Sequence, residues 1–153
     1  MKHTSDLRAA AAARGVRLVA HRGVWGGNVP PNTIAADMPF LAIVRNERDL
    51  RAIRRRKLRH VGVEALFSDA SSPFATREWI ERQHRAGQVV WANAIVYDYK
   101  TQLVAGRSDD RATAGGDPEG SWGWLADRGY DLVQTDWLLA CSLFLERTGR
   151  RKA

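Results

Sequence analysis

Five short apolar runs alternate with helical or polar segments along the chain, and this alternation constrains the fold more than any other feature. The runs are Val16–Ala20, Phe40–Val44, Val61–Phe67, Gln88–Val96 and Asp131–Thr135. Helical patterns follow several of them, at Glu47–Lys57, Thr76–Ala86, Trp122–Arg128 and Trp137–Arg147. Because strands that alternate with helices form parallel sheets, the sequence predicts an α/β fold with about five strands.

A chain of 153 residues is about one average domain long, so we expect a single domain over residues 1–153. The first fifteen residues read as an N-terminal extension or helix, with helical composition from Ser5 to Arg14. Residues 98–120 are rich in glycine and aspartate and have little periodicity, which predicts a long loop.

The chain carries 24 Lys and Arg against 17 Asp and Glu, and its net charge is +7. Most of this excess lies in the basic segment 45–59, which holds eight basic and two acidic residues. Such a segment is an electrostatic footprint for nucleic acid or an anionic membrane. A solvated outer helix is the favoured interpretation, because no aromatic side chains interleave with the arginines.

Cys141 is the only cysteine, so an internal disulfide is excluded and no Cys/His cluster has the spacing of a zinc site. The alanine run 9–13 is bracketed by Arg8 and Arg14 and is shorter than a secretory signal. The apolar stretch 137–145 is far below the length that spans a bilayer. We therefore expect a soluble, cytoplasmic protein.

Polar residues stand at or near the carboxyl ends of four predicted strands. These residues are His21, Glu64, Asn93 and Asp136. In parallel α/β folds the carboxyl ends of the strands meet at one edge, and active sites are assembled there. The pattern predicts a small-molecule site at that edge.

Two motifs at opposite ends of the chain resemble a known enzyme family. Val19-Ala20-His21-Arg22-Gly23, followed by Pro30-Pro31-Asn32-Thr33-Ile34-Ala35-Ala36, resembles the N-terminal signature of the glycerophosphodiester phosphodiesterase family. Gln134-Thr135-Asp136, together with the segments around Glu64, Asn93 and Trp122, resembles the later strands and loops of its bacterial branch. The likeness covers roughly residues 16–147.

The resemblance implies a (β/α)₈ barrel that hydrolyses glycerophosphodiesters to glycerol 3-phosphate and an alcohol, in phospholipid metabolism, with Mg²⁺ or Ca²⁺. It implies His21 as a catalytic residue and Glu64 as a metal ligand. It implies contacts to the substrate or its phosphate from Arg22, Asn32, Asn93 and Trp122. Other interpretations stay open: Arg22 in a salt bridge, Asn32 as a helix cap and Trp122 in the core.

The sequence departs from the family where the metal is held. The family has a Glu-x-Asp pair at the end of its second strand, and none is found between Ala36 and Phe40. A full barrel typically needs at least about 200 residues, so this chain resembles a member that lacks its second to fourth βα units. Glu64 alone would hold a hard divalent ion poorly, unless Asp109 or Asp110 has been recruited.

These departures predict weak or absent catalysis by a phosphoric diester hydrolase. The alternative is a non-catalytic remnant of the family. It would act through self-association as a homo-oligomer, since an incomplete barrel exposes strand edges, or through an anionic partner bound by the basic segment 45–59.

Overall fold

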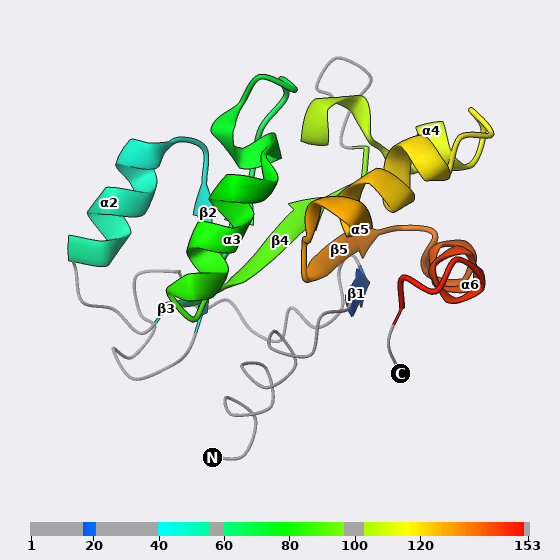
Figure 1. Cartoon of the computed structure of the whole chain (residues 1–153). Coiled ribbons are helices and arrows are strands. Elements are labelled where there is room, and N and C mark those ends of the chain that lie inside the picture. Colours follow the sequence, from blue (N-terminus) through cyan, green and yellow to red (C-terminus); the bar gives the residue numbers. More distant parts are fainter. Residues whose placement is uncertain (1–16, 21–39, 56–59, 97–102, 152–153) are drawn as a thin grey trace, which may run out of the picture.

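The computed structural model describes residues 17–20, 40–55, 60–96 and 103–151 (Figure 1). The helix predicted over Ser5–Arg14 lies outside these ranges. So do three predicted site residues, His21, Arg22 and Asn32.

The core of the fold is one parallel sheet of five strands. The strands are β1 (Arg17–Ala20), β2 (Phe40–Val44), β3 (His60–Ala65), β4 (Val89–Asn93) and β5 (Leu132–Thr135). They lie in the order β1-β5-β4-β3-β2, and every pairing is parallel. The predicted α/β class and the five strands are therefore confirmed.

Strands β3 and β4 end earlier than their apolar runs, which continue to Phe67 and Val96. After β4 the chain turns, and the side-chain oxygen of Asn93 accepts the backbone N–H of Ile95 at 3.2 Å. Burial continues beyond both strands, since Phe67 and Ile95 are buried. The apolar runs thus continue beyond the ends of the two strands, because the loop residues that follow are also part of the core.

Within the described ranges four helices pack on one face of the sheet: α2 (Glu47–Arg55), α3 (Arg77–Arg85), α5 (Trp124–Arg128) and α6 (Leu138–Arg147). Figure 1 shows them following one another across the sheet in that order. Their buried side chains join alternate strand residues in one core cluster, which includes Leu50, Trp79, Ile80, Leu125 and Leu145 from the helices and Val44, Val63, Val90, Ala92 and Val133 from the strands.

Local signals explain where α3 begins and where α3 and α5 end. Thr76 caps α3, because its hydroxyl oxygen accepts the backbone N–H of Trp79 at 3.2 Å. The chain leaves α3 through Gly87 and α5 through Gly129, with φ of 72° and 98°. Glycine adopts such left-handed conformations without steric cost, as expected at a helix C-terminus.

The basic segment forms an outer helix in its described part. Leu50 anchors α2 in the core, while Arg48, Arg51 and Arg55 are exposed. This arrangement agrees with the solvated-helix interpretation of residues 45–55. Binding of nucleic acid by this surface stays a prediction.

The prediction of one irregular loop over residues 98–120 is wrong for the part that the structure describes. Residues 103–120 contain a 3₁₀ turn, η3 (Val104–Gly106), a short helix, α4 (Asp109–Ala112), and the start of a π-helical turn, η4 (Glu119–Gly123). Side-chain caps fix these turns rather than an apolar period, since the Ser108 hydroxyl accepts from the backbone N–H of Arg111. A further short 3₁₀ turn, η2 (Pro73–Ala75), precedes α3.

The longest helix in the described ranges, α6, has 10 residues. None of the helices there has the length and apolar character needed to cross a membrane.

Gly62 in β3 lies where no side chain fits. A Cβ atom at this position would stand 2.3 Å from the carbonyl oxygen of Val89 and 2.6 Å from a methyl group of Leu41. Because the nearest contact is backbone of the paired strand, relief would require the sheet to move.

We expect Gly62→Ala to destabilise the domain by roughly 1–3 kcal/mol, because overpacking a buried strand forces backbone shifts. Urea unfolding followed by circular dichroism measures this loss. An unchanged midpoint would show that the β3–β4 spacing is looser than described.

Candidate functional site

The face of the sheet opposite the helices carries a group of buried polar side chains. Glu64 is paired in register with Trp91, and Asn93 is paired with Gln134. Side chains alternate between faces along a strand, so these four residues point away from the face that packs against the helices. The structure thus brings two predicted site residues, Glu64 and Asn93, onto one face near the carboxyl edge.

Glu64 and Asn93 contact each other directly. The Asn93 amide Nδ2 donates to Glu64 Oε1 at 3.1 Å, and Glu64 is only 8% exposed. Burial raises the pKa of the Glu64 carboxyl above its ordinary value, although the Asn93 hydrogen bond and the positive charge of Arg45 partly oppose the shift. Glu64 therefore holds its proton more strongly than a solvated glutamate does.

Trp91 adds an unsatisfied donor beside Glu64. Its indole Nε1 is buried and has no hydrogen-bond partner among the residues that the structure describes. A buried donor without an acceptor costs about 1–3 kcal/mol, and such groups in folded proteins call for an explanation. An acceptor supplied by a ligand would remove this cost.

Asp109 holds the carboxyl ends of β4 and β5 together from the helix side. Its Oδ1 accepts from Trp122 Nε1 and Thr135 Oγ1, both at 2.8 Å, and its Oδ2 accepts the backbone N–H of Asp136 at 2.8 Å. Its own backbone N–H donates to the carbonyl of Ala94 at 2.8 Å. Burial nevertheless raises the pKa of Asp109, because these bonds offset its desolvation only in part.

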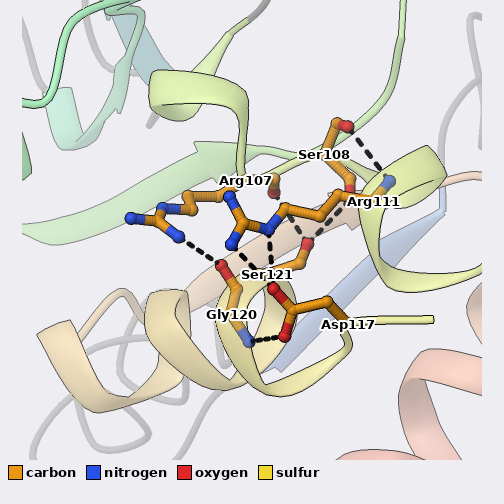
Figure 2. A network of polar contacts seen from close by, with 6 residues as sticks. All are labelled: Arg107, Ser108, Arg111, Asp117, Gly120 and Ser121. Carbon is orange, nitrogen blue, oxygen red and sulfur yellow. Dashed lines mark hydrogen bonds and ion pairs between the residues drawn. The ribbon is translucent and has the colours of Figure 1, made fainter. Parts of the chain in front are cut away.

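A polar network holds the segment that carries Asp109 (Figure 2). Arg111 donates through Nε and Nη2 to Oδ2 of Asp117, whose other oxygen accepts the N–H of Gly120 at 2.7 Å. The Ser121 hydroxyl lies within hydrogen-bond distance of the carbonyls of Arg107 and Ser108, at 2.9 and 2.7 Å. The segment 107–121 is therefore tied to itself at several points, which fixes the position of Asp109.

The described residues do not fit a site for Mg²⁺ or Ca²⁺. Within the described ranges no group of three His, Cys, Asp or Glu side chains is placed to hold a metal ion. Both oxygens of Asp109 are committed to protein donors, and Asp110 is exposed on α4. Glu64 is buried and its pKa is raised, which disfavours the charged form, whereas these hard ions need several charged or carbonyl oxygens.

Trp122 and Cys141 lie in the core on the helix side of the sheet. Trp122 is buried, and its indole donates to Asp109, so this placement favours the core interpretation that the sequence left open. Burial raises the pKa of the Cys141 thiol to about 12, as expected for an inert apolar side chain.

Sequence reasoning missed two residues of this site, Arg45 and Trp91. Arg45 was grouped with the basic segment, yet it directly follows β2, at the same edge where Glu64 was found. Strand-end position could therefore have selected Arg45. Nothing in the sequence distinguishes the Trp91 indole from an ordinary core aromatic group.

A family profile described as a domain of unknown function, DUF4996, matches residues 38–145. The chain belongs to the DUF4996 family. The match runs from the residues before β2 into α6, so it includes Glu64, Asn93 and Asp109 and excludes the His21 motif. No curated protein matches the chain. Neither comparison assigns a function to this DUF4996 domain, so a function based on the glycerophosphodiesterase resemblance is a proposal.

We expect Asp109→Asn to destabilise the DUF4996 domain by about 1–3 kcal/mol. The amide nitrogen would replace one carboxylate oxygen and would then face an N–H or O–H group that needs an acceptor. Chemical unfolding measures the loss. The matched control is Asp110→Asn, since the neighbouring Asp110 side chain is exposed. Equal stability of the two variants would contradict the role assigned to Asp109.

The raised pKa of Glu64 also predicts a pH dependence of stability. The folded state holds the Glu64 proton more strongly than the unfolded chain, in which its pKa is near 4.5. Its contribution to stability is therefore complete below that pH and is lost as pH rises through the folded-state pKa.

This dependence is measured as the difference in unfolding free energy between wild type and Glu64→Gln across pH 4 to about 8. We expect wild type to lose stability relative to the variant as pH rises. The exposed Glu81→Gln variant is the control and should give a flat difference. If wild type instead gained stability relative to Glu64→Gln as pH rises, the burial-driven rise of the Glu64 pKa would be contradicted.

Proposed function

We propose that this chain binds a phosphodiester of the glycerophosphodiester class at the carboxyl edge of its sheet, without a metal ion, and that hydrolysis is weakened or lost. The observation that carries the proposal is the buried Glu64–Asn93 pair, with the charge of Arg45 acting on it. The resemblance of the His21 motif to the glycerophosphodiester phosphodiesterases supplies the substrate class.

The chemistry of the pair suits an anionic oxygen better than a cation. In its protonated form, which burial favours, Glu64 can donate a hydrogen bond, and Asn93 orients its carboxyl group through the bond to Oε1. Arg45 supplies positive charge, and Trp91 supplies a donor that lacks an acceptor. A phosphodiester presents two oxygens that share one negative charge, so each of these groups has a matching acceptor.

The strand order supports a role for the His21 motif at the same edge. Ala20, the last residue of β1, pairs with Thr135 of β5, and His21 directly follows it in the sequence. We assign His21, Arg22 and Asn32 to the phosphate on the strength of the family resemblance. In the family's chemistry a histidine moves protons to or from the reacting oxygens.

We further infer that the sheet is a (β/α) barrel opened between β1 and β2. In a closed barrel the first strand pairs with the last, and here β1 pairs with β5. The segment between β1 and β2, residues 21–39, is too short for three βα units, because a single βαβ unit takes about 30 residues. Weak catalysis follows, since the family's Glu-x-Asp pair would lie in those units.

The test is calorimetric titration of the chain with glycerophosphocholine and glycerol 3-phosphate, in EDTA and in Mg²⁺ or Ca²⁺, with choline release followed in parallel. We expect binding in EDTA that weakens as pH rises. Glu64→Gln keeps a donor and should keep binding, without the pH dependence, whereas Glu64→Ala should weaken binding about tenfold or more. Trp91→Phe should weaken binding by a similar factor, because the ring stays and the N–H is lost.

The matched control is Glu81→Gln, whose exposed side chain lies on α3. Binding that requires Mg²⁺ or Ca²⁺ and is abolished by Glu64→Gln would overturn the metal-independent proposal. Rapid choline release lost in His21→Ala would overturn the proposed loss of hydrolysis. No binding by folded chain under any condition would reject the proposed ligand class.

A further inference from the structure

Three arginines run along the exposed side of α2. Arg48, Arg51 and Arg55 are spaced i, i+3 and i+7, so they lie on one face of the helix, and all three side chains are exposed. Leu50 holds the opposite side of the helix in the core. Figure 1 shows α2 at one end of the row of helices. We call Arg48, Arg51 and Arg55 the arginine stripe.

Helix stability accounts for other charges of α2 but not for the whole stripe. A helix favours acidic side chains in its first turn and basic ones in its last turn, as found at Glu47, Asp49 and Arg55. Arg48 lies in the first turn, where the partial positive charge of the helix end opposes a cation. Arg51 lies in the middle of the helix and gains nothing from either end. Two positions of the stripe therefore call for another explanation.

The acidic residues near the stripe do not pair with it. Within the described ranges none of the three arginines makes an ion pair. Glu47 instead accepts the Trp79 indole N–H at 2.6 Å and pairs with Arg82 at 3.5 Å. Asp49 accepts a backbone N–H from the turn before the helix at 2.9 Å. The neighbouring helix α3 exposes three arginines and two glutamates, so it does not cancel the charge of the stripe.

Arginine, rather than lysine, occupies every position of the stripe. A guanidinium group presents a flat fork of N–H donors that fits two phosphate oxygens at once, and it is less strongly hydrated than an ammonium group. With a rise of about 1.5 Å per residue, the stripe spans about 10 Å, which is the axial length of about three base pairs. Its chemistry and its length thus suit a row of phosphates.

The surroundings of the stripe favour a nucleic-acid duplex over a membrane or a single strand. The large apolar residues that are exposed in the described ranges all lie outside α2 and α3, so these helices offer nothing to insert among lipid headgroups. The only aromatic residue of the two helices, Trp79, is buried, so no ring is presented on which unstacked bases could stack. Charge without apolar or aromatic contact is typical of binding to a phosphate backbone.

We propose that the arginine stripe binds the phosphate backbone of a nucleic-acid duplex, without regard to base sequence. The three guanidinium groups contact phosphates along one strand, and the net charge of +7 draws the polyanion to the chain. This activity goes beyond the phosphodiester site at the carboxyl edge and uses none of the residues assigned to that site.

The test is fluorescence anisotropy of a short labelled duplex, as DNA and as RNA, with the single strand alongside, between about 50 and 200 mM salt. We expect both duplexes to bind more tightly than the single strand. The slope of log K against log salt should be about −3, because each neutralised phosphate contributes about −0.9. The two duplex arms show whether DNA or RNA is preferred.

Arg48→Gln, Arg51→Gln and Arg55→Gln should each weaken duplex binding several-fold and make the salt slope shallower by about one. Arg51→Lys should keep the slope and lose less affinity, because the charge stays and only the fork is lost. The matched control is Arg147→Gln, which removes the same charge from the exposed last turn of α6 and should stay within about twofold of wild type.

Circular dichroism confirms that every variant is folded. The stripe variants should bind glycerophosphocholine as wild type does, so the duplex assay and the ligand titration fail independently.

Three results would overturn the proposal. The first is folded chain that binds neither duplex at low salt. The second is an equal loss for Arg147→Gln and the stripe variants, which would assign binding to the overall charge of the chain. The third is tighter binding to the single strand, or to phosphatidylglycerol vesicles, than to either duplex, which would assign the stripe to that partner.

Discussion

The buried carboxylate of Asp109 is the interaction on which the carboxyl edge of the sheet depends. It binds the indole of Trp122 and the hydroxyl of Thr135 through one oxygen and the backbone after β5 through the other, while its own N–H binds the end of β4. A charged group in this position is costly unless its donors are held in place. The network of Arg111, Asp117 and Ser121 keeps them in place, so loop and sheet edge form one unit.

The two faces of the sheet bury different kinds of side chain. The helix face is apolar apart from a few satisfied groups such as Asp109, and it contains the core. The other face buries Glu64, Asn93 and the Trp91 indole. Buried polar groups of this kind lower stability, and here they lie beside an indole donor without an acceptor among the described residues, which supports the proposed ligand surface.

Period and turn residues were sufficient to predict the strands and the main helices from the sequence. Leu50, Trp79 and Gly87 fall where helical spacing and a left-handed end put them. The turns within residues 103–120 could not be predicted from an apolar period, because side-chain caps such as Ser108 fix them and because Asp109 binds partners that are distant in the sequence. From the sequence alone Asp109 was a possible metal ligand, because the donors that bind both of its oxygens are not visible there.

The candidate site was predictable in part. Glu64 and Asn93 were found by their strand-end positions, and their contact across neighbouring strands follows from the parallel register. The raised pKa of Glu64 was not predictable, because it depends on burial that only the packed sheet provides. The family resemblance implied a metal ion there, and burial of Glu64 disfavours the charged form that a metal ligand needs.

The pairing of β1 with β5 has a consequence for how the chain is made. Residues Arg17–Ala20 leave the ribosome early, whereas their partners Leu132–Thr135 lie more than one hundred residues later. Contacts so distant in sequence form late, since the closure of a long loop must first be offset by other contacts. Strand β1 therefore waits for its partner through most of synthesis, and the carboxyl edge of the sheet is assembled last.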